Sequence, residues 1–377
     1  MTRRERLLAT LAGKPVDRPA VSFYEIGGWE MAEDGDEFNV WNDPSWRPLV
    51  ELANERTDLI RMVKPSWKKA PEGDLADLTR QETVRVGNSR HTKTSIRAGK
   101  RTLTMTTRRD ADTQTEWVTE HLLKDMEDLD AYLSLPLPPV REPDLPAMTA
   151  IEEKLADSGI LMVDTGDPLC SAASLFAMGD YTVAAMTEGA RFHALLERFA
   201  ATIQPECERL AAGLPGRLWR IFGPEYAAEP YLPPRLFGEY VVRYTGPMVE
   251  AVRAHGGYPR IHTHGRLRGI LPLIAKMRPA GLDPLEPPPQ GDMELREIRQ
   301  AVGAHIVLFG NVEIADVENL EPATFEGKVA KALREGTEGT GRGFVLNPSA
   351  CPYGRTITTR TLTNYRTMVR MAETWAG

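Results

Sequence analysis

Two histidines, one glutamate and one cysteine in the second half of the chain are residue types that bind zinc. His262 and His264 are two residues apart, so on an extended strand both side chains point to the same face of the sheet. Glu286 comes 24 residues after His262, and Cys351 lies near the C-terminal end. Zinc accepts nitrogen, oxygen and sulfur donors in a tetrahedron. The four residues predict a zinc site only if the fold brings them together, because a His-x-His pair or a lone cysteine is a weak signal by itself.

Three further polar residues are candidates for catalysis. Glu225 follows a Gly-Pro turn and is predicted to be a general base or the reserve metal ligand; a carboxylate that starts a helix is the alternative. Asp167 and Asn311 are predicted to orient the substrate, although residues of these types after strands also cap helices.

Residues at and after the end of the first apolar run are predicted to contact the substrate. These are Tyr24, Glu25 and Trp29. Trp41 and Trp46 follow closely, and together with Trp29 they could form the wall of an apolar pocket, which suits an aromatic substrate. Clusters of aromatic residues also serve packing alone, so this interpretation stays open.

Short apolar runs alternate with amphipathic stretches along the chain, and this alternation predicts a fold in which the candidate residues lie together. Eight runs rich in Val, Ile and Leu predict strands that are buried on both faces: Ala20–Glu25, Asp58–Val63, Gly159–Thr165, Leu218–Phe222, Pro259–His264, Gly281–Glu286, His305–Asn311 and Gly343–Asn347. Helices are predicted between them: Asp180–Ala212, Pro234–His255, Leu267–Met277, Asp292–Val302 and Pro322–Arg334. The alternation predicts a (β/α)8 TIM barrel, whose active site lies at the carboxyl ends of the strands. An open doubly wound sheet is the alternative, but the chain has no good match to the Gly-rich phosphate turn of that fold.

The interval between Val63 and Gly159 is too long for one barrel helix and its loops. Within it, alternating or Thr-rich runs predict short antiparallel strands: Glu82–Val86, Thr92–Arg97, Thr102–Thr107 and Thr115–Leu122. We therefore predict one barrel domain, residues 1–377, with a small antiparallel β insertion after strand 2 at about 79–123. Because it leaves the barrel after a strand, it should stand beside the active-site mouth, as a docking wall or a lid. The alternatives are a sheet that only covers apolar surface and a contact between two copies in a homodimer.

The composition excludes several classes of protein. The 377 residues are 42% hydrophobic and include seven tryptophans, which excludes a disordered chain, and the longest apolar runs are too short to span a membrane. The 46 Lys and Arg against 53 Asp and Glu give a net charge of −7, which argues against a nucleic acid partner. The first residues lack an apolar signal segment, so we expect a cytoplasmic protein. The three cysteines have no paired spacing, which favours free thiols or a metal ligand over disulfides.

The chain resembles the uroporphyrinogen decarboxylase superfamily in four places. These are the opening Arg-Glu-Arg-Leu-Leu through Asp17-Arg18-Pro-Ala, the segment His262-Thr-His264-Gly, the segment Gly310-Asn311-Val, and Cys351 before the last helical stretch. The resemblance implies a (β/α)8 barrel with one of two chemistries. One is cofactor-free decarboxylation of the acetate groups of uroporphyrinogen, and the other is zinc-dependent methyl transfer between a corrinoid protein and a small substrate or thiol.

Details of the resemblance favour the methyltransferase branch. The decarboxylase branch has an arginine-containing Met-Arg-Gln-Ala-Gly-Arg element that meets the polycarboxylate substrate, whereas the matching segment Phe23–Trp29 has an acid and no arginine. The zinc ligands of the methyltransferase branch match His262 and Cys351, with His264 in place of an expected cysteine. Glu286 is similar in position to a zinc ligand of cobalamin-independent methionine synthase. A site with fewer thiolates is a stronger Lewis acid, which suits a methyl ether as the donor, as in O-demethylation.

The resemblance also implies cofactors and partners. Zn²⁺ would be held by His262, His264, Glu286 and Cys351, and cobalamin would be carried by a separate corrinoid protein. The nearest string to the Asp-x-His-x-x-Gly corrinoid motif is Arg260–Gly265, which lacks the aspartate. The partners are then this corrinoid protein and a small methylated substrate. The alternatives are a uroporphyrinogen decarboxylase-type carboxy-lyase and a non-catalytic ligand-binding barrel.

Overall fold

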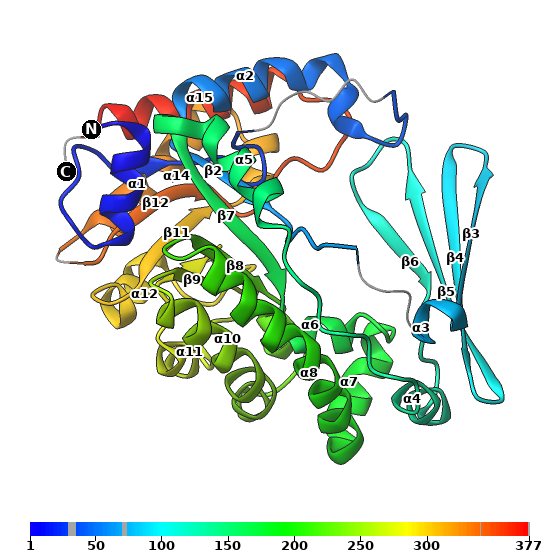
Figure 1. The fold of residues 1–377 in the computed structure, drawn as a ribbon. Coiled ribbons are helices and arrows are strands. Elements are labelled where there is room, and N and C mark those ends of the chain that lie inside the picture. Colours follow the sequence, from blue (N-terminus) through cyan, green and yellow to red (C-terminus); the bar gives the residue numbers. More distant parts are fainter. Residues whose placement is uncertain (29–34, 70–73, 340, 376–377) are drawn as a thin grey trace.

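The computed structural model describes residues 1–28, 35–69, 74–339 and 341–375 and shows eight parallel strands that curl into a barrel (Figure 1). Their order is β1-β12-β11-β10-β9-β8-β7-β2. The strands are β1 Ala20–Val21, β2 Leu59–Val63, β7 Gly159–Gly166, β8 Leu218–Phe222, β9 Tyr258–His262, β10 Gly281–Asp283, β11 Val307–Val312 and β12 Phe344–Pro348. The two ends of the sheet approach each other where the Asp58 N–H donates to the Val21 carbonyl at 2.8 Å. The predicted TIM barrel is confirmed.

Most of the helices surround the barrel, whereas α3 lies against the insertion (Figure 1). Those before β8 are α1 Arg3–Leu11, α2 Arg47–Arg56, α3 Asp74–Leu78, α4 Met126–Leu133, α5 Leu145–Leu155, α6 Pro168–Ala173, α7 Met178–Thr187 and α8 Gly189–Gly213. Those after it are α9 Pro234–Phe237, α10 Arg243–Ala254, α11 Leu271–Met277, α12 Leu295–Val302, α13 Ile314–Asn319, α14 Pro322–Thr337 and α15 Thr359–Glu373. Short 3₁₀ segments are Val40–Asn42, Pro44–Trp46, Ala156–Ser158 and Pro224–Ala227, and Gly238–Val242 forms a π turn.

Several predicted boundaries are wrong. The helix predicted over Asp180–Ala212 is interrupted, because Glu188 leaves helical geometry with φ −111° and ψ 43° between α7 and α8. Strands β1, β9 and β10 end earlier than predicted, so Glu25, His264 and Glu286 lie on the loops that follow them. A parallel ladder ends where the backbone turns away from its neighbour, and apolar composition alone does not mark that point.

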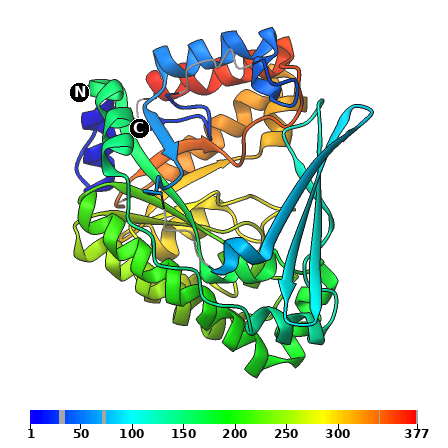
Figure 2. The ribbon, with the colours of Figure 1, turned by 45° about the vertical axis from the view of Figure 1, so that its right-hand side comes forward.

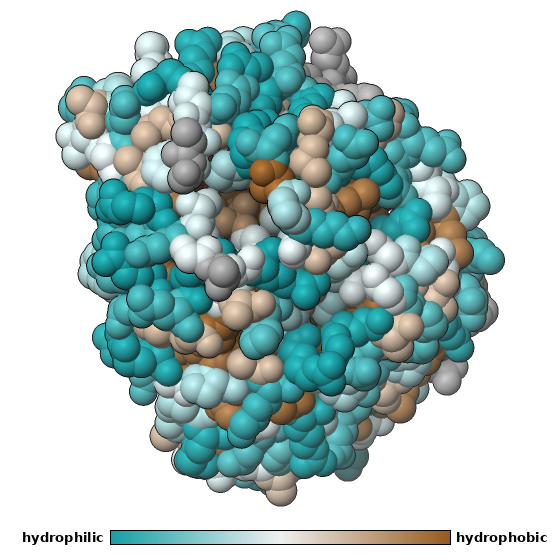
Figure 3. All heavy atoms as spheres, turned by 90° about the vertical axis from the view of Figure 1, so that its left-hand side faces the viewer, coloured by the Kyte–Doolittle hydropathy of each residue, from teal (hydrophilic) through white to brown (hydrophobic). Residues whose placement is uncertain are grey.

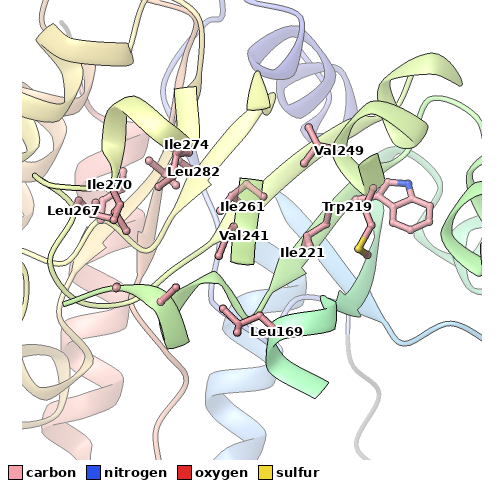
Figure 4. Close-up of a cluster of buried hydrophobic side chains, with 14 of the residues drawn as sticks. Leu169, Trp219, Ile221, Val241, Val249, Ile261, Leu267, Ile270, Ile274 and Leu282 are labelled. Carbon is pink, nitrogen blue, oxygen red and sulfur yellow. The ribbon is translucent and has the colours of Figure 1, made fainter. Parts of the chain in front are cut away.

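Alternate residues of each strand face opposite sides of the barrel wall. Trp219 and Ile221 of β8 pack among the side chains labelled in Figure 4, which come from surrounding helices and neighbouring strands. Leu218, with Ile60, Ile160 and Val307 of other strands, belongs to a separate apolar cluster that α1 also joins. Arg220 shares the face of Leu218, so the barrel interior changes along β8 from apolar to charged.

The insertion is a second sheet on the side of the barrel where the candidate residues lie. Its antiparallel strands are β3 Thr79–Val86, β4 Ser89–Ala98, β5 Arg101–Asp110 and β6 Glu116–Glu120. The arrowhead of β7 points to the side where this sheet stands, and Figure 2 shows the sheet beside the barrel in a second view (Figures 1 and 2). The predicted insertion after strand 2 is present.

Two backbone bridges hold the insertion to the barrel, and a third closes its base. Its two connecting segments are joined by the bridge between Trp67 and Pro143, with the Lys68 N–H donating to the Glu142 carbonyl at 2.9 Å. Thr113, between β5 and β6, bridges to Gly354 after β12. Another bridge joins Leu123 to Phe176. The insertion is thus tied to the barrel at two places beside the mouth.

The face of the molecule on the left of Figure 1, away from the insertion, is shown in Figure 3. Hydrophilic side chains dominate it, with apolar ones scattered between them. A surface of this kind is usual for a protein in water. None of the described helices is both long and apolar enough to cross a membrane.

Candidate active site

His262, at the end of β9, belongs to a buried chain of polar side chains that Asp283 links to Arg260. Its Nδ1 lies 2.8 Å from Oδ2 of Asp283, and the Nε of Arg260 lies 2.9 Å from Oδ1 of the same carboxylate. All three side chains are at most 2% exposed. Burial, followed by the nearby Arg220 guanidinium, lowers the pKa of His262 to about 3. The imidazole is therefore neutral, and its Nδ1 donates to Asp283.

Asp283 stays ionised despite its burial. Burial raises the pKa of this carboxyl, but the Arg260 charge and the His262 hydrogen bond outweigh it and bring the pKa to about 2. The residue ends β10, next to β9 in the sheet, with Asp283 directly opposite His262 in the register. The pairing of the two strands thus fixes Nδ1 as the ring nitrogen of His262 that is hydrogen-bonded to Asp283.

Arg220 joins this cluster from β8. Its guanidinium lies 2.7 Å from Oδ1 of Asp164 and 5.3 Å from the centre of the Tyr24 ring. The Tyr24 hydroxyl is 3.5 Å from Nδ1 of His262, and the two rings stack at 5.9 Å. The structure therefore brings the predicted substrate residue Tyr24 to the predicted metal ligand His262.

Four charged residues of this cluster were not predicted from the sequence: Asp164, Arg220, Arg260 and Asp283. The sequence nevertheless contains a pattern by which these four residues could have been found. Each stands within or at the end of a strand that is otherwise mainly apolar, and Arg260 is two residues from His262, so both must face the same side. Charged residues are rarely buried unless paired, which makes such positions candidates for a functional interior.

His264 and Glu286 form a second pair beside the first. Nδ1 of His264 lies 2.8 Å from Oε1 of Glu286, whose other oxygen accepts from the Gly265 N–H at 2.9 Å. The rings of His262 and His264 are perpendicular, with centres 4.6 Å apart. Burial lowers the pKa of His264, but its bond to Glu286 outweighs this and raises it. His264 is 40% exposed, so it is open to the mouth.

Cys351 lies with Glu25 and a residue of the insertion. Its sulfur is 3.3 Å from Oε2 of Glu25 and 3.5 Å from Oε1 of Gln114, which also accepts from the Trp41 indole at 3.1 Å. Glu25 has a left-handed backbone, φ 62°, which is unusual for a residue with a side chain. Burial, and then the Glu25 carboxylate, raise the pKa of the Cys351 thiol well above its usual value. Gln114 was not predicted, and only the mouth-side placement of the insertion pointed to such a contact.

Asp167, after β7, is a fully buried carboxyl group, and Glu225, after β8, is half-buried. Oε2 of Glu225 accepts from the Gly223 N–H at 2.7 Å, and burial raises the pKa of Glu225, while His264 is close enough to lower it. Asp167 caps α6 by accepting from the Cys170 N–H at 2.7 Å, and it accepts from the Thr245 hydroxyl at 2.6 Å. Burial raises the pKa of Asp167 to about 7. The contacts of Asp167 thus fit the alternative prediction for this residue, which is that it caps a helix.

The remaining predicted residues have less defined roles. Asn311 is buried in β11, opposite Asn347 of β12 in the register. Trp29 lies outside the described residues. Trp41 and Trp46 stack on each other at 4.9 Å, and Trp46 is fully buried with its indole N–H donating to the Arg355 carbonyl at 3.0 Å. Trp46 is therefore a packing residue and not a pocket wall.

The two histidines fit a metal ion better than the other two predicted ligands do. Metal-binding histidines commonly give their second ring nitrogen to a carboxylate, as His262 and His264 do, which leaves both Nε2 atoms available. Glu286 uses one oxygen for His264 and the other for Gly265, and Cys351 lies against Glu25. Among the described residues, no three His, Cys, Asp or Glu side chains are grouped so that they could hold a metal ion.

Comparisons with known proteins show the family. The model of the uroporphyrinogen decarboxylase (URO-D) family matches residues 108–375. The chain belongs to this family. Its barrel is similar to a methyltransferase from Methanosarcina mazei, at 18% identity and a TM-score of 0.63 over 99% of this chain and 98% of that one. A mannanase of Bacillus subtilis, BCman, aligns at 10% identity and a TM-score of 0.41 over 94% and 87% of the two chains. No curated protein sequence matches the chain.

Proposed function

We propose that this member of the URO-D family is a methyltransferase that moves a methyl group from a small methylated substrate, such as a methyl ether, to the cobalt of a corrinoid on a separate protein. The observation that carries the proposal is the pairing of both arginines of the described cluster with aspartates, Arg220 with Asp164 and Arg260 with Asp283. The name of the Methanosarcina mazei structure supports the same reaction class.

The paired arginines argue against decarboxylation of uroporphyrinogen. A substrate with many carboxylates needs free cations, and each guanidinium here already has an anionic partner. The mouth also holds the carboxylates of Glu25 and Glu286, which would repel a polyanion. A methyl donor with at most one negative charge meets much less of this repulsion.

Demethylation of an ether needs a proton for the departing oxygen. The cobalt(I) electron pair forms the new bond to the methyl carbon, the carbon–oxygen bond breaks, and the oxygen leaves as an alkoxide or phenolate. Glu225 would protonate this oxygen; burial raises its pKa, and its charge acts on nearby His264, which supports this role. Its Oε2 is held by the Gly223 N–H, which leaves Oε1 to carry the proton.

Zinc is part of the proposal. His262 and His264 would hold it through Nε2, with Asp283 and Glu286 orienting the two rings, and Cys351 is a further candidate ligand. When bound, zinc would act as a Lewis acid on the ether oxygen. The protein would orient the two rings, keep His262 neutral and repel polyanionic molecules from the mouth.

The experiment mixes the purified protein with a corrinoid protein reduced to cobalt(I) and a panel of methyl ethers. Formation of methylcobalt, followed by its absorbance spectrum, is the expected result. Parallel incubation with uroporphyrinogen tests the alternative. Loss of carboxylates there, without methylcobalt in any ether reaction, would replace the proposal with a carboxy-lyase.

A further inference from the structure

A large cavity lies beside the mouth, lined by residues of α6 and α8 on one side and of the two segments that connect the insertion on the other. Its volume is about 1270 Å³. Its apolar lining includes Trp67, Leu137, Phe199, Ile203, Trp219 and Phe222. None of the predicted metal ligands lines it. The cavity is therefore separate from the histidine cluster, although it approaches that cluster at one end.

The outer wall of the cavity is preformed. Besides the Trp67–Pro143 bridge, the Asp144 N–H donates to the Ser66 carbonyl at 2.9 Å. The guanidinium of Arg141 lies 4.4 Å from the centre of the Trp67 ring and binds both carboxylate oxygens of Glu206 on α8, at 2.8 and 2.7 Å. This clamp joins the connecting segments to the helix across the cavity, so the space does not depend on a ligand to open it.

The polar groups of the lining are mostly satisfied by the protein. The hydroxyls of Ser171, Ser174 and Thr202 donate to carbonyls of their own helices, at 3.1–3.2 Å. Glu206 is taken by Arg141. Lys64 differs, since it has no acidic partner among the residues that the structure describes and its side chain is exposed. The chemistry of the cavity is thus an aromatic and proline-rich body with one available cation.

The inner end of the cavity meets the catalytic mouth. Asp164 and Phe222 line the cavity, and both contact the Arg220 guanidinium, which also lies over the Tyr24 ring. The Tyr24 hydroxyl reaches His262. A molecule that occupies the cavity therefore places one end beside the residues of the active site.

We propose that this cavity binds the body of the substrate, and that the substrate is an aromatic molecule of more than one ring with a single anionic group that pairs with Lys64. Ligand pockets of about 300–1,000 Å³ hold drug-sized molecules, so a single-ring ether would leave most of this space empty. Trp67 and Phe222 supply flat faces for stacking, and the lack of a second free cation selects against a polyanion. The inference rests on the proposed function only in calling the ligand a substrate.

Binding is tested without corrinoid or methyl donor, with two fluorescent probes that differ in one group. The probe 8-anilinonaphthalene-1-sulfonate is a multi-ring monoanion, and N-phenyl-1-naphthylamine is its uncharged analogue. We expect one sulfonate probe per folded chain. Trp67→Ala should weaken both probes at least tenfold, whereas Lys64→Ala should weaken the sulfonate several-fold and leave the uncharged probe unchanged.

Matched variants control for the removal of a tryptophan or a lysine elsewhere. Trp117→Ala, on the exposed insertion sheet, and Lys68→Ala, beside the cavity, should bind both probes as the unmodified protein does. If Trp67→Ala does not fold, Thr202→Trp fills the cavity from α8 and should abolish binding. Unchanged affinity in Thr202→Trp, or an equal loss for both probes in Lys64→Ala, would overturn the proposal. Probe binding without methyl transfer would refute only the proposed function.

Discussion

Oε1 of Gln114, in the loop between β5 and β6, lies 3.5 Å from the sulfur of Cys351, which follows β12. The two residues are far apart in the sequence, and they meet because the insertion reaches back across the mouth. Thr113 bridges to Gly354, and the Gln114 N–H donates to the Tyr353 carbonyl at 3.1 Å. The insertion therefore supplies part of the surroundings of the thiol.

Removing this contact should make the thiol more accessible. We expect Gln114→Ala to increase the rate of Cys351 alkylation by iodoacetamide several-fold, because the variant loses an acceptor and opens space beside a side chain that is 6% exposed. Peptide mass spectrometry measures the rate for each cysteine, and buried Cys207 serves as an internal control. Gln81→Ala, on exposed β3, is the matched variant. Equal labelling of Cys351 in both variants would contradict the assigned contact.

Asp283 should be among the residues on which stability depends most. Asp283→Asn keeps the shape but leaves the fully buried Arg260 charge without a counterion, and breaking a buried pair costs about 3–5 kcal/mol. The exposed pair of Arg56 and Glu373 gives a control, since removing a surface pair with Glu373→Gln should cost only about 0–1 kcal/mol. Urea unfolding measures both. Similar losses in the two variants would mean that the buried pair is not the source of the stability.

The barrel was predictable because strands buried on both faces have a strong apolar signal and recur with helices between them. The antiparallel insertion was predictable from its Thr-rich runs and the Gly-containing turns between them. The exact ends of β1, β9 and β10 were not, since they depend on where a neighbouring strand stops pairing. The helix predicted across Glu188 also fails: Glu188 leaves helical geometry directly before Gly189, the residue at which α8 begins and a type that weakens helices.

The candidate site was predicted as a set of residues but not as a set of contacts. Spacing places His262 and His264 on one side, yet their carboxylate partners depend on register between strands, which fixes Asp283 opposite His262. Cys351 was expected beside His262, whereas its contacts are Glu25 and Gln114. A left-handed residue such as Glu25 changes the direction of a loop in a way that its side chain type does not reveal.

The raised pKa of Asp167 predicts a pH dependence of stability. An acid whose pKa rises from 3.8 in the unfolded chain to about 7 in the fold binds its proton more tightly when folded, so its favourable contribution is complete below pH 4 and is lost as the pH rises to 7. Asp167→Asn removes this titration. We expect the variant to gain up to about 4 kcal/mol relative to the unmodified protein between pH 4 and pH 8. Urea unfolding across this range measures the difference, and a constant difference would show that Asp167 is ionised throughout.

Metal analysis tests the zinc part of the proposed function. We expect about one zinc per chain in the purified protein and a loss of most of it in His262→Ala and in His264→Ala, because each removes an Nε2 donor. Cys351→Ala asks whether the thiol is a ligand. His255→Ala, whose exposed ring pairs with Glu208, is the matched control and should keep its zinc. Equal, substoichiometric zinc in all five proteins would remove zinc from the proposal.

Charge reversal at two neighbouring arginines of the insertion should have very different effects on the proteolysis of the insertion. Arg109 donates to the Phe38 carbonyl at 3.3 Å and to the Gln114 carbonyl, so it ties β5 to the chain before α2 and to the loop beside Cys351. Arg108 points to the other face of β5 and pairs with Asp110 at 3.1 Å, where its side chain is 40% exposed. Arg109→Glu would place a carboxylate against two carbonyl oxygens, and we expect it to loosen the insertion and speed its cleavage in limited proteolysis.

Arg108→Glu is the matched control and should leave the rate of proteolysis unchanged. Any effect of this variant on corrinoid-dependent turnover, on the salt dependence of turnover or on a dimer would therefore report an interaction made by the surface of the sheet. Equal cleavage of the two variants would show that Arg109 does not anchor the insertion.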